Sequence, residues 1–133
     1  MMRVLTTLII LFAALSIHAQ SATDPDSRLL EVYEADYLAR METNHPVMLA
    51  RLNYYLDHAW FITEYPTQKG TPNFPEVTIE DLDQINILQL EKTQALVRDY
   101  DQRKMYTIAG TNKVLVYFSG KEFTENFNAF IRG

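Results

Sequence analysis

The chain has 133 residues, of which 12 are basic and 17 acidic, so its formal net charge at pH 7 is −5. A moderately acidic protein is a poor match for nucleic acid or for an anionic membrane surface. The chain contains no cysteine, which excludes disulfides, a thiolate nucleophile and cysteine-based zinc or iron–sulfur sites.

Residues 1–19 have the pattern of a secretory signal peptide. Arg3 provides the positive charge, residues 4–17 are mostly apolar and uncharged, and Ala19 stands at a plausible cleavage position. The apolar run has roughly 14 residues, fewer than the roughly 20 that a membrane-spanning helix needs. We therefore expect an exported protein, periplasmic or extracellular, that begins at Gln20 and is not inserted in a membrane after cleavage. An uncleaved anchor is the alternative.

Residues 24–42 predict the first helix of a single domain that spans residues 20–133. Asp24 is placed to cap this helix and Pro25 to occupy its first position. The apolar residues that recur with helical spacing are Leu29, Leu30, Tyr33, Tyr37 and Met41. The Asn-His-Pro stretch at 44–46 ends the helix, because the residue before a proline disfavours the helical region.

A second helix is predicted over residues 46–63, and it includes most of the aromatic-rich stretch NYYLDHAWFITEYP at 53–66. Helical spacing puts one set of residues on the buried side, namely Leu52, Leu56, Ala59 and Trp60. Three others fall on the opposite side, namely Tyr54, Asp57 and Phe61. Two aromatic rings on an outer face need cover, and we expect the loop at 64–78 to provide it in preference to a binding partner.

Residues 64–78 contain Pro66, Gly70, Pro72 and Pro75, so we expect a long irregular loop. Thr78 and Asp81 are spaced like a capping box and predict a short helical turn. Two short strands are predicted next, at 86–90 and 95–99, with a helix over 79–97 as the alternative.

Residues 104–109 and 113–119 predict a β-hairpin, because both are rich in β-branched and aromatic residues and they flank the turn sequence Gly-Thr-Asn at 110–112. Alternation places Val114, Val116 and Phe118 on one face of the second strand. Leu115 and Tyr117 lie on the other, so both faces are apolar and both are expected to be covered.

Ser119 and Glu122 form a full capping box at the start of a closing amphipathic helix. Its apolar residues are Phe123, Phe127, Phe130 and Ile131, and we expect the three phenylalanines to be buried against the hairpin. The predicted fold class is α+β, with two N-terminal helices, a three- or four-stranded antiparallel meander and a C-terminal amphipathic helix.

The pattern gives little support for a metal or cofactor site. His45 and His58 are the histidines beyond the predicted signal, and they lack the spacing of a zinc motif. Adjacent helix positions diverge by about 100°, so Asp57 and His58 are poorly placed to share one ion. Acidic residues at 80–83 lack the glycine and the terminal glutamate of a calcium loop. We predict no metal and no cofactor.

Two functions of different classes fit these observations. The favoured one is a non-catalytic, partner-binding or envelope-accessory protein, with Tyr54 and Phe61 as candidate binding residues and a protein as the partner. The alternative is a small hydrolase or lyase that uses His58 as general base. In that enzyme Arg51 stabilises an anion and Tyr54 or Tyr55 donates a proton. Both leave the oligomeric state open.

Overall fold

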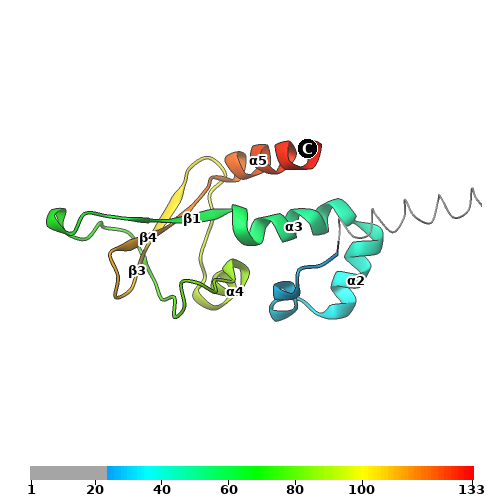
Figure 1. Ribbon diagram of the computed structural model, residues 1–133, viewed down its shortest axis with the longest axis horizontal. Helices are drawn as coiled ribbons and strands as arrows, with labels where there is room; N and C mark the ends of the chain where they lie inside the picture. Colours follow the sequence, from blue (N-terminus) through cyan, green and yellow to red (C-terminus); the bar gives the residue numbers. More distant parts are fainter. Residues whose placement is uncertain (1–23) are drawn as a thin grey trace, which may run out of the picture. The chain divides into compact units, whose positions relative to one another are not determined.

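The computed structural model describes residues 24–133, and the predicted signal peptide at 1–19 lies outside them. The fold class is α+β, as predicted (Figure 1). The elements in this part of the chain are the 3₁₀ helices η1 (Ser27–Glu31) and η2 (Thr67–Lys69), the helices α2 (Ala35–Asn44), α3 (Pro46–His58), α4 (Ile87–Gln94) and α5 (Gly120–Arg132), and the strands β1 (Trp60–Glu64), β2 (Glu76–Val77), β3 (Lys104–Ile108) and β4 (Lys113–Tyr117).

The chain divides into two compact units within α3, between Asn53 and Tyr54. In the first unit, the single helix predicted over 24–42 is wrong, because η1 and α2 are separate. The cap of η1 is Asp26, not Asp24. Its side chain accepts the N–H of Arg28 at 2.9 Å and forms an ion pair with the Arg28 guanidinium at 2.8 Å. An aspartate that bonds its own downstream backbone competes with a regular α-helix.

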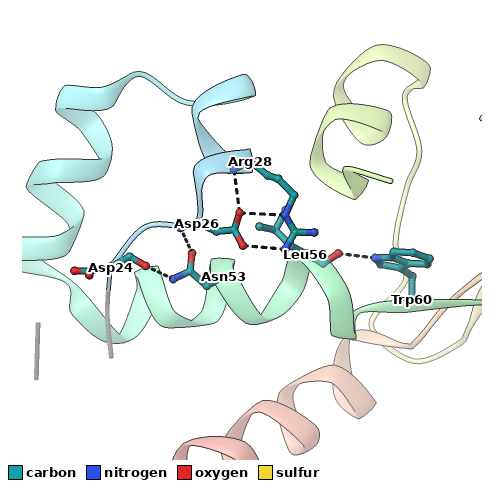
Figure 2. Close-up of polar contacts among 6 residues, drawn as sticks. All are labelled: Asp24, Asp26, Arg28, Asn53, Leu56 and Trp60. Carbon is teal, nitrogen blue, oxygen red and sulfur yellow. Dashed lines mark hydrogen bonds and ion pairs between the residues drawn. The ribbon is translucent and has the colours of Figure 1, made fainter. Parts of the chain in front are cut away.

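Asn53 fixes the start of the described chain to α3. Its amide oxygen accepts the N–H of Asp26 at 2.9 Å, and its amide nitrogen donates to the carbonyl of Asp24 at 2.7 Å (Figure 2). The break before α2 falls at Glu34, which is extended (φ −71°, ψ 147°) and caps α2 without a side-chain bond. The buried apolar residues of this unit are Leu29, Leu38, Met41 and Leu49.

The second predicted helix is correct only to His58, because the chain then enters β1. Aromatic and β-branched residues at 60–63 favour a strand. This segment pairs with β4, and Trp60 lies opposite Tyr117. The Trp60 indole N–H donates to the carbonyl of Leu56 at 2.8 Å and satisfies an acceptor at the helix end (Figure 2). Phe61 is therefore on a strand and not beside Tyr54 on a helical face.

The burial predicted for this stretch is confirmed in part. Leu56 and Ala59 are fully buried, as predicted, and Asp57 is exposed, as predicted. Leu52 and Trp60 are only half-buried. Trp60 departs from the helical expectation because it occupies the first position of β1, where its side chain packs at the margin of the core.

The sheet has the order β1-β4-β3-β2, and it is mixed, so the purely antiparallel meander is wrong. The β3–β4 hairpin is confirmed, with Met105 opposite Val116. β1 is antiparallel to β4, whereas β2 is parallel to β3. Parallel neighbours need a long crossover connection, and here that connection runs through α4.

The segment between β2 and β3 contains a helix in place of the two strands predicted at 86–90 and 95–99. The alternative of a helix was right in type but too long. Asn86 caps α4 by accepting the N–H of Gln89 at 3.3 Å, and Ala95 ends it in a left-handed conformation with φ 53°. Thr78 does not begin a helix. Its N–H and carbonyl instead bond the side chain of Gln94, at 2.9 and 2.6 Å.

The core of the second unit lies on one face of the sheet. Its strand residues include Tyr106, Ile108, Leu115 and Tyr117, which alternate with residues of the other face. The C-terminal half of α3 contributes Tyr55, and Ala59 follows directly after that helix. α4 and α5 contribute Ile87 and Phe123. Three helices therefore bury a single face of the sheet.

The opposite face of β4 is also covered, as predicted, and Val114 and Val116 are each only 4% exposed. Cross-strand pairing puts Phe61 on this face beside Val116. The rings of Phe61 and Phe118 lie 5.3 Å apart, and the Arg103 guanidinium lies over both, 5.7 and 5.2 Å from their centroids. Aromatic rings and an arginine side chain therefore contribute to the cover of this face.

The capping box of α5 is confirmed. Ser119 accepts the N–H of Glu122 at 3.1 Å, and the Glu122 carboxylate accepts the N–H of Ser119 at 3.2 Å. The N–H of Gly120 donates to the carbonyl of Asp99 at 2.9 Å. A side chain at Gly120 would place its Cβ 3.1 Å from the Cα of Tyr100, so this close approach of the two segments requires a glycine.

The burial predicted for α5 is correct for Phe123 and Phe127 and wrong for Phe130. Phe123 and Phe127 are buried, whereas Phe130 is 59% exposed and Ile131 46%. The core cluster includes Phe123 at the start of α5, and the last turn of the helix extends beyond it. The stripe is therefore core at one end and surface at the other.

We predict that Phe127→Ala lowers the free energy of unfolding by about 3–5 kcal/mol, the usual cost of deleting a buried phenylalanine side chain. The matched variant Phe130→Ala removes the same atoms from an exposed position and should cost about 1 kcal/mol, the value of one aromatic contact. Urea denaturation of both variants measures the difference. Equal losses would contradict this assignment of core and surface within α5.

Candidate functional site

Tyr54, a binding candidate from the sequence, lies in a cluster of aromatic rings. Its ring centroid is 5.8 Å from that of Phe123, 5.6 Å from Phe127 and 4.7 Å from Phe130, all on α5. The imidazole of His58 stacks on the same ring at 4.3 Å, with an angle of 15° between the planes. The cover of Tyr54 therefore comes from α5, whereas the sequence analysis predicted that the loop at 64–78 would provide it.

The structure brings Tyr54 and His58 together, one turn apart on α3, and separates Phe61 from them. Phe61 contacts Phe118 and Arg103 on the far face of the sheet. His58 is exposed, and Arg51, half-buried on α3, belongs to the other compact unit. Tyr54 and His58 were both named for the hydrolase or lyase. The structure brings these two side chains into contact, and the contact is a stack of their rings.

The cluster of rings extends to the protein surface. We define the α3–α5 patch as the side chains of Tyr54, His58, Phe130 and Ile131. Phe130 stacks on Tyr54 yet is more than half exposed, and Ile131 lies within the same apolar arc of α5. The patch is apolar, aromatic and continuous with the buried Phe123 and Phe127.

A second constellation surrounds Tyr55, in which Tyr55 and Tyr117 are buried and Glu91 and Arg98 are half-buried. The Tyr55 hydroxyl donates to the Glu91 carboxylate at 2.5 Å, and the Arg98 guanidinium lies 4.5 Å above the Tyr55 ring. The same guanidinium lies 5.6 Å from the ring of Phe123. The Tyr117 hydroxyl and the Nη1 of Arg98 are buried and make no hydrogen bond in this part of the chain. We call Tyr55, Glu91, Arg98 and Tyr117 the Tyr55 cluster.

Burial controls the protonation of the Tyr55 cluster. Desolvation raises the pKa of Glu91, while the hydrogen bond from Tyr55 and the charge of Arg98 oppose the rise. Desolvation also raises the pKa of Tyr55, with the Glu91 hydrogen bond adding to it, and the pKa of Tyr117, with the Glu91 charge adding to it. The Tyr117 hydroxyl is close enough to Glu91 to favour the carboxylate, although its geometry falls short of a hydrogen bond.

A carboxylate with a raised pKa is a common mark of an active site, but the surroundings of Glu91 favour a structural role. Tyr55 and Tyr117 are 5% and 0% exposed, so their phenols do not face a solvent-filled cleft. The four residues come from α3, α4, the segment before β3, and β4. Their interactions join these elements within the second unit.

Sequence reasoning named Tyr55 only as a possible proton donor and missed Glu91, Arg98 and Tyr117. Tyr55 and Glu91 are 36 positions apart, and a local sequence pattern does not predict a contact over that separation. A weak signal existed in α4, where Glu91 follows the apolar residues Ile87, Leu88 and Leu90. An acid in such surroundings is either exposed on the other face or paired.

Residues 24–133 contain no group of three or more histidine, aspartate or glutamate side chains placed to hold a metal ion. No helix among these residues is long and apolar enough to cross a membrane. Compared with protein-family models, with curated proteins and with solved structures, the chain shows no significant match. Its function is therefore argued from its own residues.

The Tyr55 cluster predicts a loss of stability in alkali. The phenols of Tyr55 and Tyr117 have raised pKa values in the folded state, so their contribution is complete below their ordinary value of 10.0 and is lost as the pH rises above it. Each phenol should add about 1.4 kcal/mol per pH unit to this slope.

Urea denaturation between pH 9 and 11.5 measures the slope. Tyr55→Phe and Tyr117→Phe should each reduce this slope by about 1.4 kcal/mol per pH unit, the contribution of one proton. Tyr100→Phe, at an exposed position, should leave the slope unchanged. A slope that is the same in the wild type and in both cluster variants would show that these phenols ionise in the folded protein.

Proposed function

We propose that the protein is an exported, non-catalytic domain that binds a protein partner through the α3–α5 patch. The observation that carries this proposal is the exposure of Phe130, which is 59% accessible although its ring stacks on Tyr54. Two helices thus hold an aromatic surface in fixed geometry. Rigid, exposed aromatic residues continuous with a core are typical anchors of protein interfaces.

The chemistry of the patch favours a protein over other partners. An aromatic stack with an adjacent isoleucine accommodates aliphatic or aromatic side chains, which lose water on contact. The net charge of −5 disfavours nucleic acid and anionic lipid. We therefore infer a partner segment that presents a small number of apolar side chains to Tyr54, Phe130 and Ile131.

The alternative, a hydrolase or lyase with His58 as base, has less support. A general base acts on a substrate held in reach, normally in a cleft that excludes water. His58 is exposed, and the contact recorded for its ring is the face of Tyr54. The one carboxylate with a raised pKa in the described chain, Glu91, is paired with a buried tyrosine. Export rests on the signal-like pattern of residues 1–19.

The partner is sought by affinity capture from the exported fraction of the native cells, with quantitative mass spectrometry of what is retained. The double variant Phe130→Ser/Ile131→Ser should retain at least tenfold less of the partner. Its melting temperature should stay within a few degrees of the wild-type value, because both residues are exposed. The intact mass of the bait also reports whether residues 1–19 have been removed.

The matched control is Val97→Ser, which alters an equally exposed apolar residue away from α5. A retained protein counts as the partner only if Val97→Ser keeps it and the double variant loses it, and if the purified pair repeats this difference in a binding titration. Retention by the double variant would contradict the proposal.

A further inference from the structure

β1 forms one edge of the sheet along its whole length. In the order β1-β4-β3-β2 it pairs with β4 alone, over all five of its residues. The other edge strand, β2, has only two residues. A strand edge presents unpaired N–H and C=O groups that another strand can use.

The hydrogen bonds at the two ends of the β1–β4 ladder show which groups face outward. The N–H of Phe118 donates to the carbonyl of Ala59 at 3.0 Å, and the N–H of Tyr65 donates to the carbonyl of Asn112 at 2.9 Å. Backbone groups alternate along an antiparallel strand. Odd-numbered residues of this segment therefore point toward β4, and Trp60, Ile62 and Glu64 direct their N–H and C=O groups to the open side.

This open side has little of the usual protection of an edge. Proteins guard such edges with charged side chains, proline, a bulge or a very short strand. β1 contains no proline, its one charged residue, Glu64, is the last of the strand, and its register with β4 is regular over residues 60–64. In the described part of the chain, the outward N–H and C=O groups of Trp60, Ile62 and Glu64 make no hydrogen bond. The partner that matches them is another β-strand.

We propose that β1 pairs antiparallel with β1 of a second copy of this chain, about a two-fold axis at Ile62. Ile62 then lies opposite Ile62 of the second copy, and Trp60 lies opposite Glu64 of the second copy. Each of these pairs exchanges both of its outward hydrogen bonds. The two four-stranded sheets become one continuous sheet, with an isologous interface.

The sequence of the strand favours this register for pairing with a second copy. A two-fold axis at Glu64 would place two glutamates directly opposite, which is destabilising. An axis at Trp60 would require His58 to pair as a strand, and His58 is the last residue of α3. The axis at Ile62 uses all three outward residues and keeps the carboxylates apart. The proposed pairing involves the sheet alone and is independent of the α3–α5 patch.

Sedimentation velocity of the purified protein over a micromolar concentration series tests the pairing. Glu64→Pro removes an outward N–H and leaves the bonds to β4 intact, because edge positions of this kind tolerate proline. Glu64→Gln is the matched control and keeps the N–H. The wild type and Glu64→Gln should dimerise alike, and Glu64→Pro should raise the dissociation constant at least tenfold with its circular dichroism spectrum unchanged.

Crosslinking tests whether β1 lies at the interface. Because the chain has no cysteine, Thr63→Cys provides a single thiol at an exposed position of β1, close to Thr63 of the second copy in the proposed dimer. A short bis-maleimide should join two Thr63→Cys chains and not two Asn128→Cys chains, whose thiol lies on α5. A wild type that is monomeric throughout, a Glu64→Pro variant that dimerises normally, or equal crosslinking at both positions would each overturn the proposal.

Discussion

The arrangement of the second unit depends on the hydrogen bond between the Tyr55 hydroxyl and the Glu91 carboxylate. α4 has only eight residues, so it is too short to be stable without tertiary contacts. Burial penalises the ionised Glu91, and the Tyr55 hydroxyl and the charge of Arg98 offset the penalty. The Tyr55 ring also meets Phe123 edge-on at 5.3 Å. One side chain therefore links α3 with α4, α5 and the segment that holds Arg98.

The surfaces of this unit follow from that link. With Phe123 held against Tyr55, the start of α5 is fixed to the core, and its last turn carries Phe130 and Ile131 past the core to the surface. The helices cover one face of the sheet and leave the outer edge of β1 open. The unit thus presents an aromatic patch between two helices and an unpaired strand edge, both suited to macromolecular contacts.

Local patterns predicted the local parts of this fold. The β3–β4 hairpin and the Ser119–Glu122 capping box depend on residues a few positions apart, and both are confirmed. The end of α3 was mispredicted because apolar spacing continues past His58, and only the pairing of Trp60 with Tyr117, far along the chain, makes it a strand. The Tyr55 cluster was missed for the same reason. A half-buried acid and a phenol partner 36 positions away leave little mark in either local sequence. Exposed Phe130 was assigned to the core because a helical stripe does not reveal where the core ends.

A double-mutant cycle with Tyr55→Phe and Glu91→Met tests the central claim most directly. Phenylalanine lacks the donor hydroxyl, and methionine keeps a similar side-chain length but lacks the carboxylate acceptor, so the coupling energy reports the link between α3 and α4. Denaturant unfolding at neutral pH should give a coupling of about 1.5–3 kcal/mol, the range for a hydrogen bond to a charged group. Additive effects, with a coupling below about 0.5 kcal/mol, would show that the fold does not depend on this contact.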